Sequence, residues 1–373
     1  MLALTKTSFL LNLWDLVLIA FLLYYYWKYN TSSDYPQSST ISSKGLLLGL
    51  FVFALTSWIN PDYFHYMTFV KLADVDWAFS DKNVGEYAYQ VICSATNGNY
   101  FLFRSIVWGS SILFIYLTTK RLEFDTHHSL FCILIMFPIV FSYGRATLAM
   151  SIYFYAVSFL CSSESKYKLS TLLITAILLY FSTFFHRSII ILLVITPIVF
   201  FLGRKWVISD LTLLFYILAI IIGVISFSDI LYQSGTIEDK VLASKLSRYS
   251  QKEFEAANIF GKISDMMKYA TFYVTTFILT YAIANNTDVP AKTQKLFSIC
   301  LAIVLVSTGL YFSGSKNFTL FYRTLNMAFI PLSLLTAQMH REEILSHKQF
   351  MAIILVCLLN TSFVFIYGCY RYL

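Results

Sequence analysis

Residues 141–150 read Phe-Ser-Tyr-Gly-Arg-Ala-Thr-Leu-Ala-Met and place a single arginine between long apolar stretches of the chain. Residues 184–188, Phe-Phe-His-Arg-Ser, repeat this pattern further along. A charge at the centre of a bilayer costs roughly 2.5–3.5 kcal/mol on insertion scales, so a charge kept in such surroundings needs a partner or a task. We therefore interpret both stretches as short turns between membrane-spanning helices.

The composition supports this interpretation. Hydrophobic residues make up 58% of the 373 residues and charged residues only 13%, which is far from the composition of a soluble domain. The 27 tyrosines and 35 phenylalanines are typical of a protein whose aromatic side chains lie at bilayer interfaces. The basic residues are scattered between the apolar stretches, so we expect no nucleic-acid partner.

The apolar stretches predict an all-α, polytopic integral membrane protein that forms a single membrane domain over residues 1–373. A spanning helix needs about 20 mostly apolar residues, and about twelve stretches qualify. Their centres lie near residues 17, 52, 110, 135, 154, 177, 196, 218, 275, 304, 330 and 359. The stretches near 135, 154 and 196 are short or tightly connected, so about eleven spans or a re-entrant segment would also fit.

The distribution of lysine and arginine predicts the orientation. Alternate loops each carry two basic residues, and the positive-inside rule assigns such loops to the cytoplasm. Both termini and the remaining turns would then face the outer side. The basic residues in question are Lys28, Lys44, Lys120, Arg121, Lys166, Lys168, Arg204, Lys205, Lys292, Lys295, Arg341 and Lys348.

Two longer external loops are predicted, over residues 60–99 and 228–263. In the first, Asp62 and Tyr66 are followed by Glu86 and Tyr89, so carboxylates lie next to aromatic residues. Aromatic rings stack on sugar faces, and carboxylates accept or deprotonate sugar hydroxyls, although a solvated acidic loop would have the same composition.

The second external loop is predicted to contain a short helix over residues 237–249. Apolar residues recur there at helical spacing between charged residues, which is typical of an amphipathic helix lying on a membrane surface.

The outer turns hold basic residues where the positive-inside rule predicts few. Arg145, Arg187 and Arg323 could each extend to the lipid head groups from a helix end. Together they could instead clamp a pyrophosphate, with bidentate hydrogen bonds that lysine does not reproduce. His186 is either a neutral ring at a helix end or a general base, because its pKa is easily moved across neutrality.

We predict no metal site and no cofactor. The cysteines lack metal or redox spacing, and the chain has no Gly-rich phosphate loop. Asp74 and Asp76 resemble the DxD motif of nucleotide-sugar transferases, but they fall on the outer side, where nucleotide sugars are not available.

Several of these stretches resemble a known group of proteins. Residues 144–149 and 185–188 are similar to the arginine and Phe-His-Arg-Ser motifs of the EpsG-like and O-antigen polymerase (Wzy) families. Residues 62–66 and 85–87 resemble the first external loop of the same group, and residues 322–323 are a looser match. The resemblance extends over roughly residues 60 to 325.

The resemblance implies a polysaccharide polymerase of the bacterial inner (cytoplasmic) membrane. Such a glycosyltransferase joins undecaprenyl-pyrophosphate-linked oligosaccharide units, its donor and acceptor, at the periplasmic face. It is a step of surface polysaccharide or lipopolysaccharide biosynthesis. A chain-length regulator and a flippase are further partners that this class implies.

The resemblance also implies roles for individual residues. Arg145, Arg187 and Arg323 would bind the donor pyrophosphate, and His186 or Glu86 would accept the proton of the acceptor hydroxyl. The residues expected to help seat the sugars are Asp62, Tyr66 and Tyr89.

Two other functions remain open on sequence alone. A flippase or transporter of the same lipid-linked unit would suit the number of spans, but no internal repeat is evident. A membrane O-acyltransferase of the polysaccharide would need basic residues on the inner side. His127 and His128 are there, without a recognisable carboxylate and arginine pattern around them in the sequence.

Overall fold

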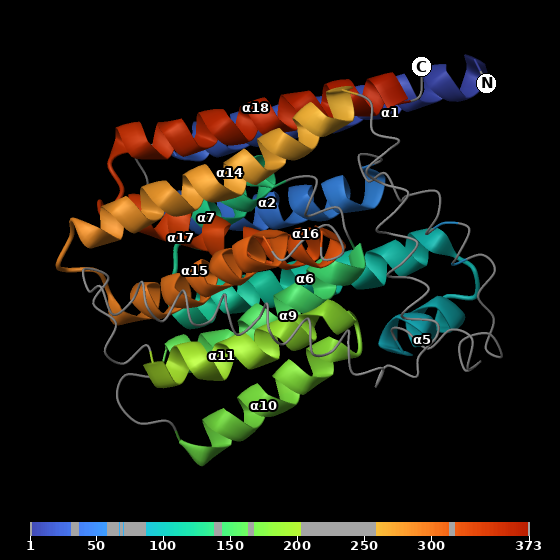
Figure 1. The fold of residues 1–373 in the computed structure, drawn as a ribbon. Helices are drawn as coiled ribbons and strands as arrows, with labels where there is room; N and C mark the ends of the chain where they lie inside the picture. Colours follow the sequence, from blue (N-terminus) through green and yellow to red (C-terminus); the bar gives the residue numbers. More distant parts are fainter. Residues whose placement is uncertain are drawn as a thin grey trace.

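The computed structural model describes residues 2–30, 37–57, 67, 70, 87–137, 144–162, 168–202, 259–312 and 318–371. Over these residues the chain is helical and contains no strand, which confirms the all-α prediction. The long helices lie side by side in one bundle, and the first turn of α1 lies near the last turn of α18 (Figure 1). The helices are α1 (Leu2–Asn30), α2 (Gln37–Thr56), α5 (Tyr87–Ala95), α6 (Tyr100–Leu122), α7 (Thr126–Met136), α9 (Gly144–Cys161), α10 (Leu169–Thr183), the 3-10 turn η2 (Arg187–Ile189), α11 (Ile190–Leu202), α14 (Ile259–Ala284), α15 (Ala291–Phe312), α16 (Phe318–Asn326), α17 (Phe329–Arg341) and α18 (His347–Arg371).

The helices have the apolar character of a membrane protein. By length and composition, Tyr100–Leu122 and Ala291–Tyr311 could each cross a bilayer, and six further apolar helices or helix portions among the described residues are shorter. Along α10, Leu169 and Ile177 expose 73% and 66% of their surface, as side chains that face lipid would. Helix α7 has 11 residues and is therefore about 16 Å long, shorter than the roughly 20 residues of an ordinary span.

Close packing of α1 against α2 depends on two small residues. Gly45 and Gly49 are one helical turn apart, and a Cβ atom on either would overlap Tyr25 or Leu22 of α1. Small residues at this spacing let two membrane helices approach closely. Further along the pair, the Ser57 hydroxyl donates to a carboxylate oxygen of buried Asp15 at 3.2 Å.

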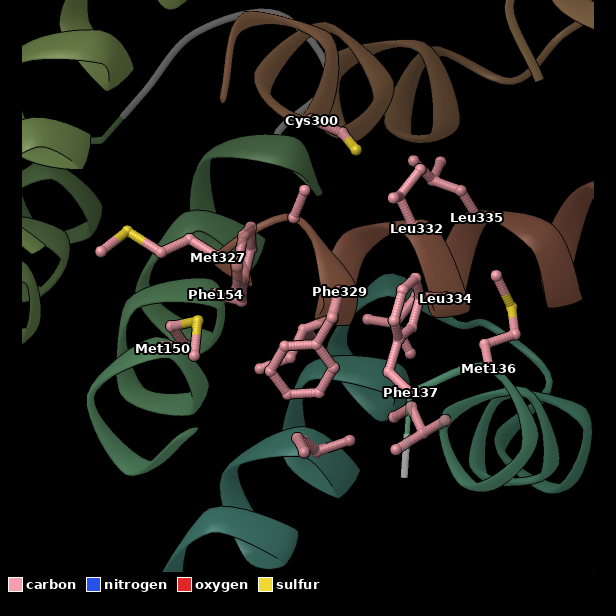
Figure 2. Packing of buried hydrophobic residues seen from close by; sticks show 14 of the residues in the cluster. Met136, Phe137, Met150, Phe154, Cys300, Met327, Phe329, Leu332, Leu334 and Leu335 are labelled. Carbon is pink, nitrogen blue, oxygen red and sulfur yellow. The ribbon is translucent and has the colours of Figure 1, made fainter. Parts of the chain in front are cut away.

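The apolar core lies where α7, α9, α15 and α17 meet, and Figure 2 shows its side chains. Phe137, directly after α7, stacks on Phe272 of α14 with ring centroids 4.7 Å apart. The same ring meets Phe329 at the start of α17 edge-on, at 6.1 Å. Every residue of α7 is buried, so this short helix lies wholly inside the bundle.

Loops predicted to share one side of the membrane do meet at one end of the bundle. Lys292, at the start of α15, forms an ion pair with Glu123 after α6, at 3.0 Å. Arg341, at the end of α17, lies 3.6 Å from Asp125, before α7. We call this the basic-loop end, and the opposite end, where α6 begins, the distal end.

Two segments differ from the expectation of long loops. Residues 87–95 of the first predicted loop form α5, because Tyr89, Gln90 and Cys93 fall at helical spacing and bury one face of that helix. Residues 259–263 of the second predicted loop already belong to α14. The predicted amphipathic helix over residues 237–249 lies outside the described residues.

Candidate functional site

The turn that carries His186 is fixed by backbone hydrogen bonds at the distal end. The His186 N–H donates to the Ser182 carbonyl oxygen at 3.4 Å, and the Ile189 N–H donates to the His186 carbonyl oxygen at 3.1 Å. These bonds close the end of α10 and start η2, which contains Arg187. The His186 side chain is 8% exposed, so it lies inside the protein rather than among head groups.

Helix α5 docks on this turn. The Ala88 N–H donates to the Phe184 carbonyl oxygen at 3.3 Å, a bond between segments far apart in the sequence. The neighbouring Tyr89 is 2% exposed, and its ring meets Phe103 of α6 edge-on with centroids 4.9 Å apart. Helix α5, which lies within the first predicted external loop, is therefore held against the His186 turn.

Tyr89 also reaches the start of α9. A Cβ atom added at Gly144 would lie 3.5 Å from the Tyr89 hydroxyl oxygen and 3.4 Å from Val107. Gly144 directly precedes Arg145, so the backbone of Arg145 lies close to α5. Because η2 also contacts α9, the segments that carry Arg145 and Arg187 converge with α5 at the distal end.

The third predicted basic turn lies beside the second. Helix α16, which carries Tyr322 and Arg323, contacts η2 and packs along α15. Arg323 is exposed, whereas Phe321 and Leu325 are buried, so α16 turns a polar face outward. The N-terminus of α9 adds the positive end of a helix dipole to this region.

A buried lysine that the sequence analysis overlooked belongs to the same region. Lys268 of α14 is 6% exposed, and its amine donates a hydrogen bond to the Tyr322 hydroxyl. Its Nζ also lies 4.5 Å from the centroid of the Tyr322 ring. The signal that singled out Arg145, a basic residue in an apolar stretch, would have found Lys268 as well.

The remaining predicted site residues divide into two groups. Asp62, Tyr66 and Glu86 lie outside the described residues. Arg145 and Arg187 have described backbones, at the second residue of α9 and the first of η2, and their side chains are not described. Across the described ranges, no group of three or more His, Cys, Asp or Glu residues is arranged to hold a metal ion.

A second polar cluster lies at the basic-loop end. There, a cavity of about 350 Å³ is lined by residues of the turn before α7 and of the end of α17 through the start of α18. Asp125 and Arg341 both line the cavity beside His128. Asp125 is three residues before His128 in the chain, whereas Arg341 comes from the end of α17, so the sequence alone did not reveal the arginine. The lining residues are Asp125, His128, His340, Arg341, Glu343, Leu345, Ser346 and His347.

The histidines of this cavity are engaged inside the protein. His128 Nδ1 is hydrogen-bonded to the Tyr26 hydroxyl, and His128 Nε2 lies 3.1 Å from His340 Nδ1. Both ring nitrogens of His128 therefore connect α7 to α1 and α17, which leaves neither available to a substrate. The ring of His340 stacks on Phe350 of α18 at 4.0 Å, and burial, together with His347 and Arg341, lowers its pKa.

Comparison with known proteins gives one match. The model of the EpsG family matches residues 45–372, which is most of the chain and includes every element of the distal end described above. No curated protein and no solved structure matches the chain significantly. This chain therefore belongs to the EpsG family, a membrane protein family of polysaccharide-polymerase-like glycosyltransferases.

Proposed function

We propose that this protein is a bacterial inner-membrane polysaccharide (O-antigen) polymerase that joins undecaprenyl-pyrophosphate-linked repeat units at the periplasmic face. The observation that carries the proposal is the convergence of α5, the start of α9 and the His186 turn at the distal end. Lys292 and Arg341, two of the basic residues that the positive-inside rule assigns to the cytoplasm, lie at the opposite end.

The chemistry is a glycosyl transfer. A hydroxyl oxygen of the acceptor unit attacks the anomeric carbon of the donor chain, and the bond from that carbon to the pyrophosphate oxygen breaks. The electron pair leaves with undecaprenyl pyrophosphate. Arg145, Arg187 and Arg323 bind the pyrophosphate and stabilise the charge that develops on it, without a metal or cofactor.

The proton of the acceptor hydroxyl needs a base. His186 and Glu86 are the two candidates, and His186 has the support of its backbone, which is held beside Arg187. Its burial would limit the access of water, which would otherwise compete with the acceptor.

The sugars would lie over the first external segment. Asp62 and Tyr66 accept or stack on sugar groups from the loop that precedes α5. Tyr89 contributes differently, because its ring is covered by Phe103 and 2% of its surface is exposed. It acts through its hydroxyl and by fixing α5 against Gly144.

The membrane topology that suits this function has about twelve spans, with external loops over residues 60–99 and 228–263. A helix over residues 237–249 would close over the site and exclude water from the donor. The undecaprenyl-linked donor and acceptor enter from the bilayer, and a chain-length regulator and a flippase are the expected protein partners.

Lipopolysaccharide banding on a gel tests the proposal, in a strain that lacks the gene and in the same strain with the wild-type gene restored. We expect the ladder to collapse to core plus one repeat unit, and restoration to recover it. Loss of every repeat unit would instead indicate the flippase. An intact ladder would overturn both for this polymer, and loss of polysaccharide acetylation would then indicate an acyltransferase.

A further inference from the structure

Lys268 occupies an unusual position for a lysine in a membrane helix. It lies about 13 Å along α14 from Ile259, at 1.5 Å per residue, and it is 6% exposed. A basic residue held within a membrane bundle is costly, and such residues commonly mark a substrate or ion pathway. The position therefore requires an explanation beyond the packing of α14.

Lys268 belongs to the distal half of the bundle. Helix α14 ends at Ala284, and the loop that follows reaches Lys292 and its ion pair with Glu123 at the basic-loop end. The first turns of α14 therefore lie toward the distal end. There, Tyr269 meets Phe321 of α16 at 5.1 Å, so α14 and α16 pack together around Lys268.

The contacts of Lys268 with Tyr322 orient its amine. The hydroxyl of Tyr322 accepts a hydrogen bond, and the ring lies 4.5 Å from Nζ. A hydroxyl oxygen and an aromatic ring face are both favourable partners for a cation, so Tyr322 holds the amine in place. Tyr322 directly precedes Arg323, and the helix that carries both contacts η2, whose first residue is Arg187.

We propose that Lys268 is a further anion-binding residue that contacts a pyrophosphate oxygen of the lipid-linked donor from the α14 side, with Tyr322 holding its amine in place. The inference rests on the proposed function and extends it, because it adds a buried point charge to the arginines. Arginine forks fix the plane of a phosphate, whereas a lysine amine supplies a compact charge with three donors.

The test is a binding titration of the purified full-length protein in lipid nanodiscs. The probes are undecaprenyl pyrophosphate and undecaprenyl monophosphate, and the variants are Lys268→Met, Lys268→Gln and Tyr322→Phe. Lys348→Met, at an exposed lysine of the basic-loop end, is the matched control for loss of one positive charge. The melting temperature of each variant is measured in the same nanodiscs.

We expect Lys268→Met and Lys268→Gln to weaken pyrophosphate binding roughly tenfold or more, as for loss of a hydrogen bond to a charged group. Monophosphate binding should weaken less, so the preference for pyrophosphate should fall. Tyr322→Phe keeps the ring and loses the hydroxyl, so we expect a smaller loss of affinity. Lys348→Met should bind both probes as the wild type does.

The outcomes separate this inference from the proposed function. If the wild type binds pyrophosphate and builds polymer while either Lys268 variant that folds keeps its affinity and its preference, the inference is wrong and the proposed function stands. Loss of melting temperature with unchanged affinity would equally assign Lys268 a structural role. If the wild type neither prefers pyrophosphate nor builds polymer, both proposals fail.

Discussion

The backbone N–H of Ala88 donates to the carbonyl oxygen of Phe184 at 3.3 Å, which joins α5 to the turn that carries His186. The two residues belong to segments separated by α6, α7, α9 and α10. This backbone bond couples α5, in the first predicted external loop, to a basic turn of the candidate site. The proposed function requires this coupling, because sugars held by one segment must meet a pyrophosphate held by the other.

Removal of this bond should impair polymer formation more than stability. Ala88 is the second residue of α5, where proline is tolerated by a helix, so Ala88→Pro removes the N–H without breaking α5. We expect a loss of about 1 kcal/mol in stability and a clear shortening of the polymer on a banding gel. Ala88→Ser keeps the N–H and should behave as the wild type. Full-length polymer from Ala88→Pro would show that the docking of α5 is dispensable.

Substitution of Arg145 tests the mode of anion binding. If the arginine holds the pyrophosphate through two parallel hydrogen bonds, Arg145→Lys should be nearly as damaging as Arg145→Ala, because lysine supplies a point charge. Polymer length on a gel is the measurement. Arg121→Lys is the control for loss of a guanidinium elsewhere in the protein, because Arg121 stacks on the Phe159 ring at 3.6 Å and lies outside the candidate site. It should leave polymer length unchanged. Retention of most polymer length by Arg145→Lys would contradict bidentate binding.

The sequence predicted the all-helical class, the family, and which loops share one end of the bundle. All three depend on patterns that are local in the chain. Apolar stretches and basic loops repeat along the chain, and each can be recognised from a short piece of sequence, without knowledge of what packs against it. Helix α5 was missed because Tyr89 and Cys93 reveal a buried face only once α6 is packed beside them.

Two contributions to the polar clusters could not be read in this way. Lys268 contacts Tyr322 of α16, and the arginine that lines the cavity beside His128 is Arg341 at the end of α17. Each of these pairs joins residues far apart in the chain, and no local spacing encodes them. The family motifs identify which turns matter, whereas the packing decides what surrounds them.

The α1–α2 contact gives a stability prediction with an internal control. A Cβ atom at Gly45 would lie 2.5 Å from Cζ of Tyr25, so Gly45→Ala must displace a ring and should cost about 1–3 kcal/mol. At Gly109 the nearest atom would be Cε2 of Phe51 at 3.4 Å, which is ordinary contact. Gly109→Ala should therefore be neutral or stabilise α6 by up to about 1 kcal/mol. The melting temperatures of the two purified variants are compared, and equal shifts would contradict the contact.

The histidine cluster at the basic-loop end predicts how stability depends on pH. Burial, reinforced by His347 and Arg341, lowers the pKa of His340, so the folded protein keeps this ring neutral. The neutral ring can share a proton with His128 Nε2, 3.1 Å away. As the pH falls through the ordinary histidine value of about 6.5, the unfolded chain takes up a proton that the folded protein resists. Stability should therefore decrease between pH 7.5 and 5.5.

His340→Gln separates this contribution from the other titrating groups of the cavity. Glutamine retains a side chain that can hydrogen-bond to His128 but does not titrate, so the melting temperature should fall less steeply with decreasing pH than in the wild type. The other histidines of the chain are present in both proteins, and the Asp125 and Glu343 carboxylates and the Arg341 guanidinium border the cavity in both. The slope should therefore shrink rather than vanish. A wild type that gains stability on acidification, or a variant with an unchanged slope, would show that His340 is not held neutral by its surroundings.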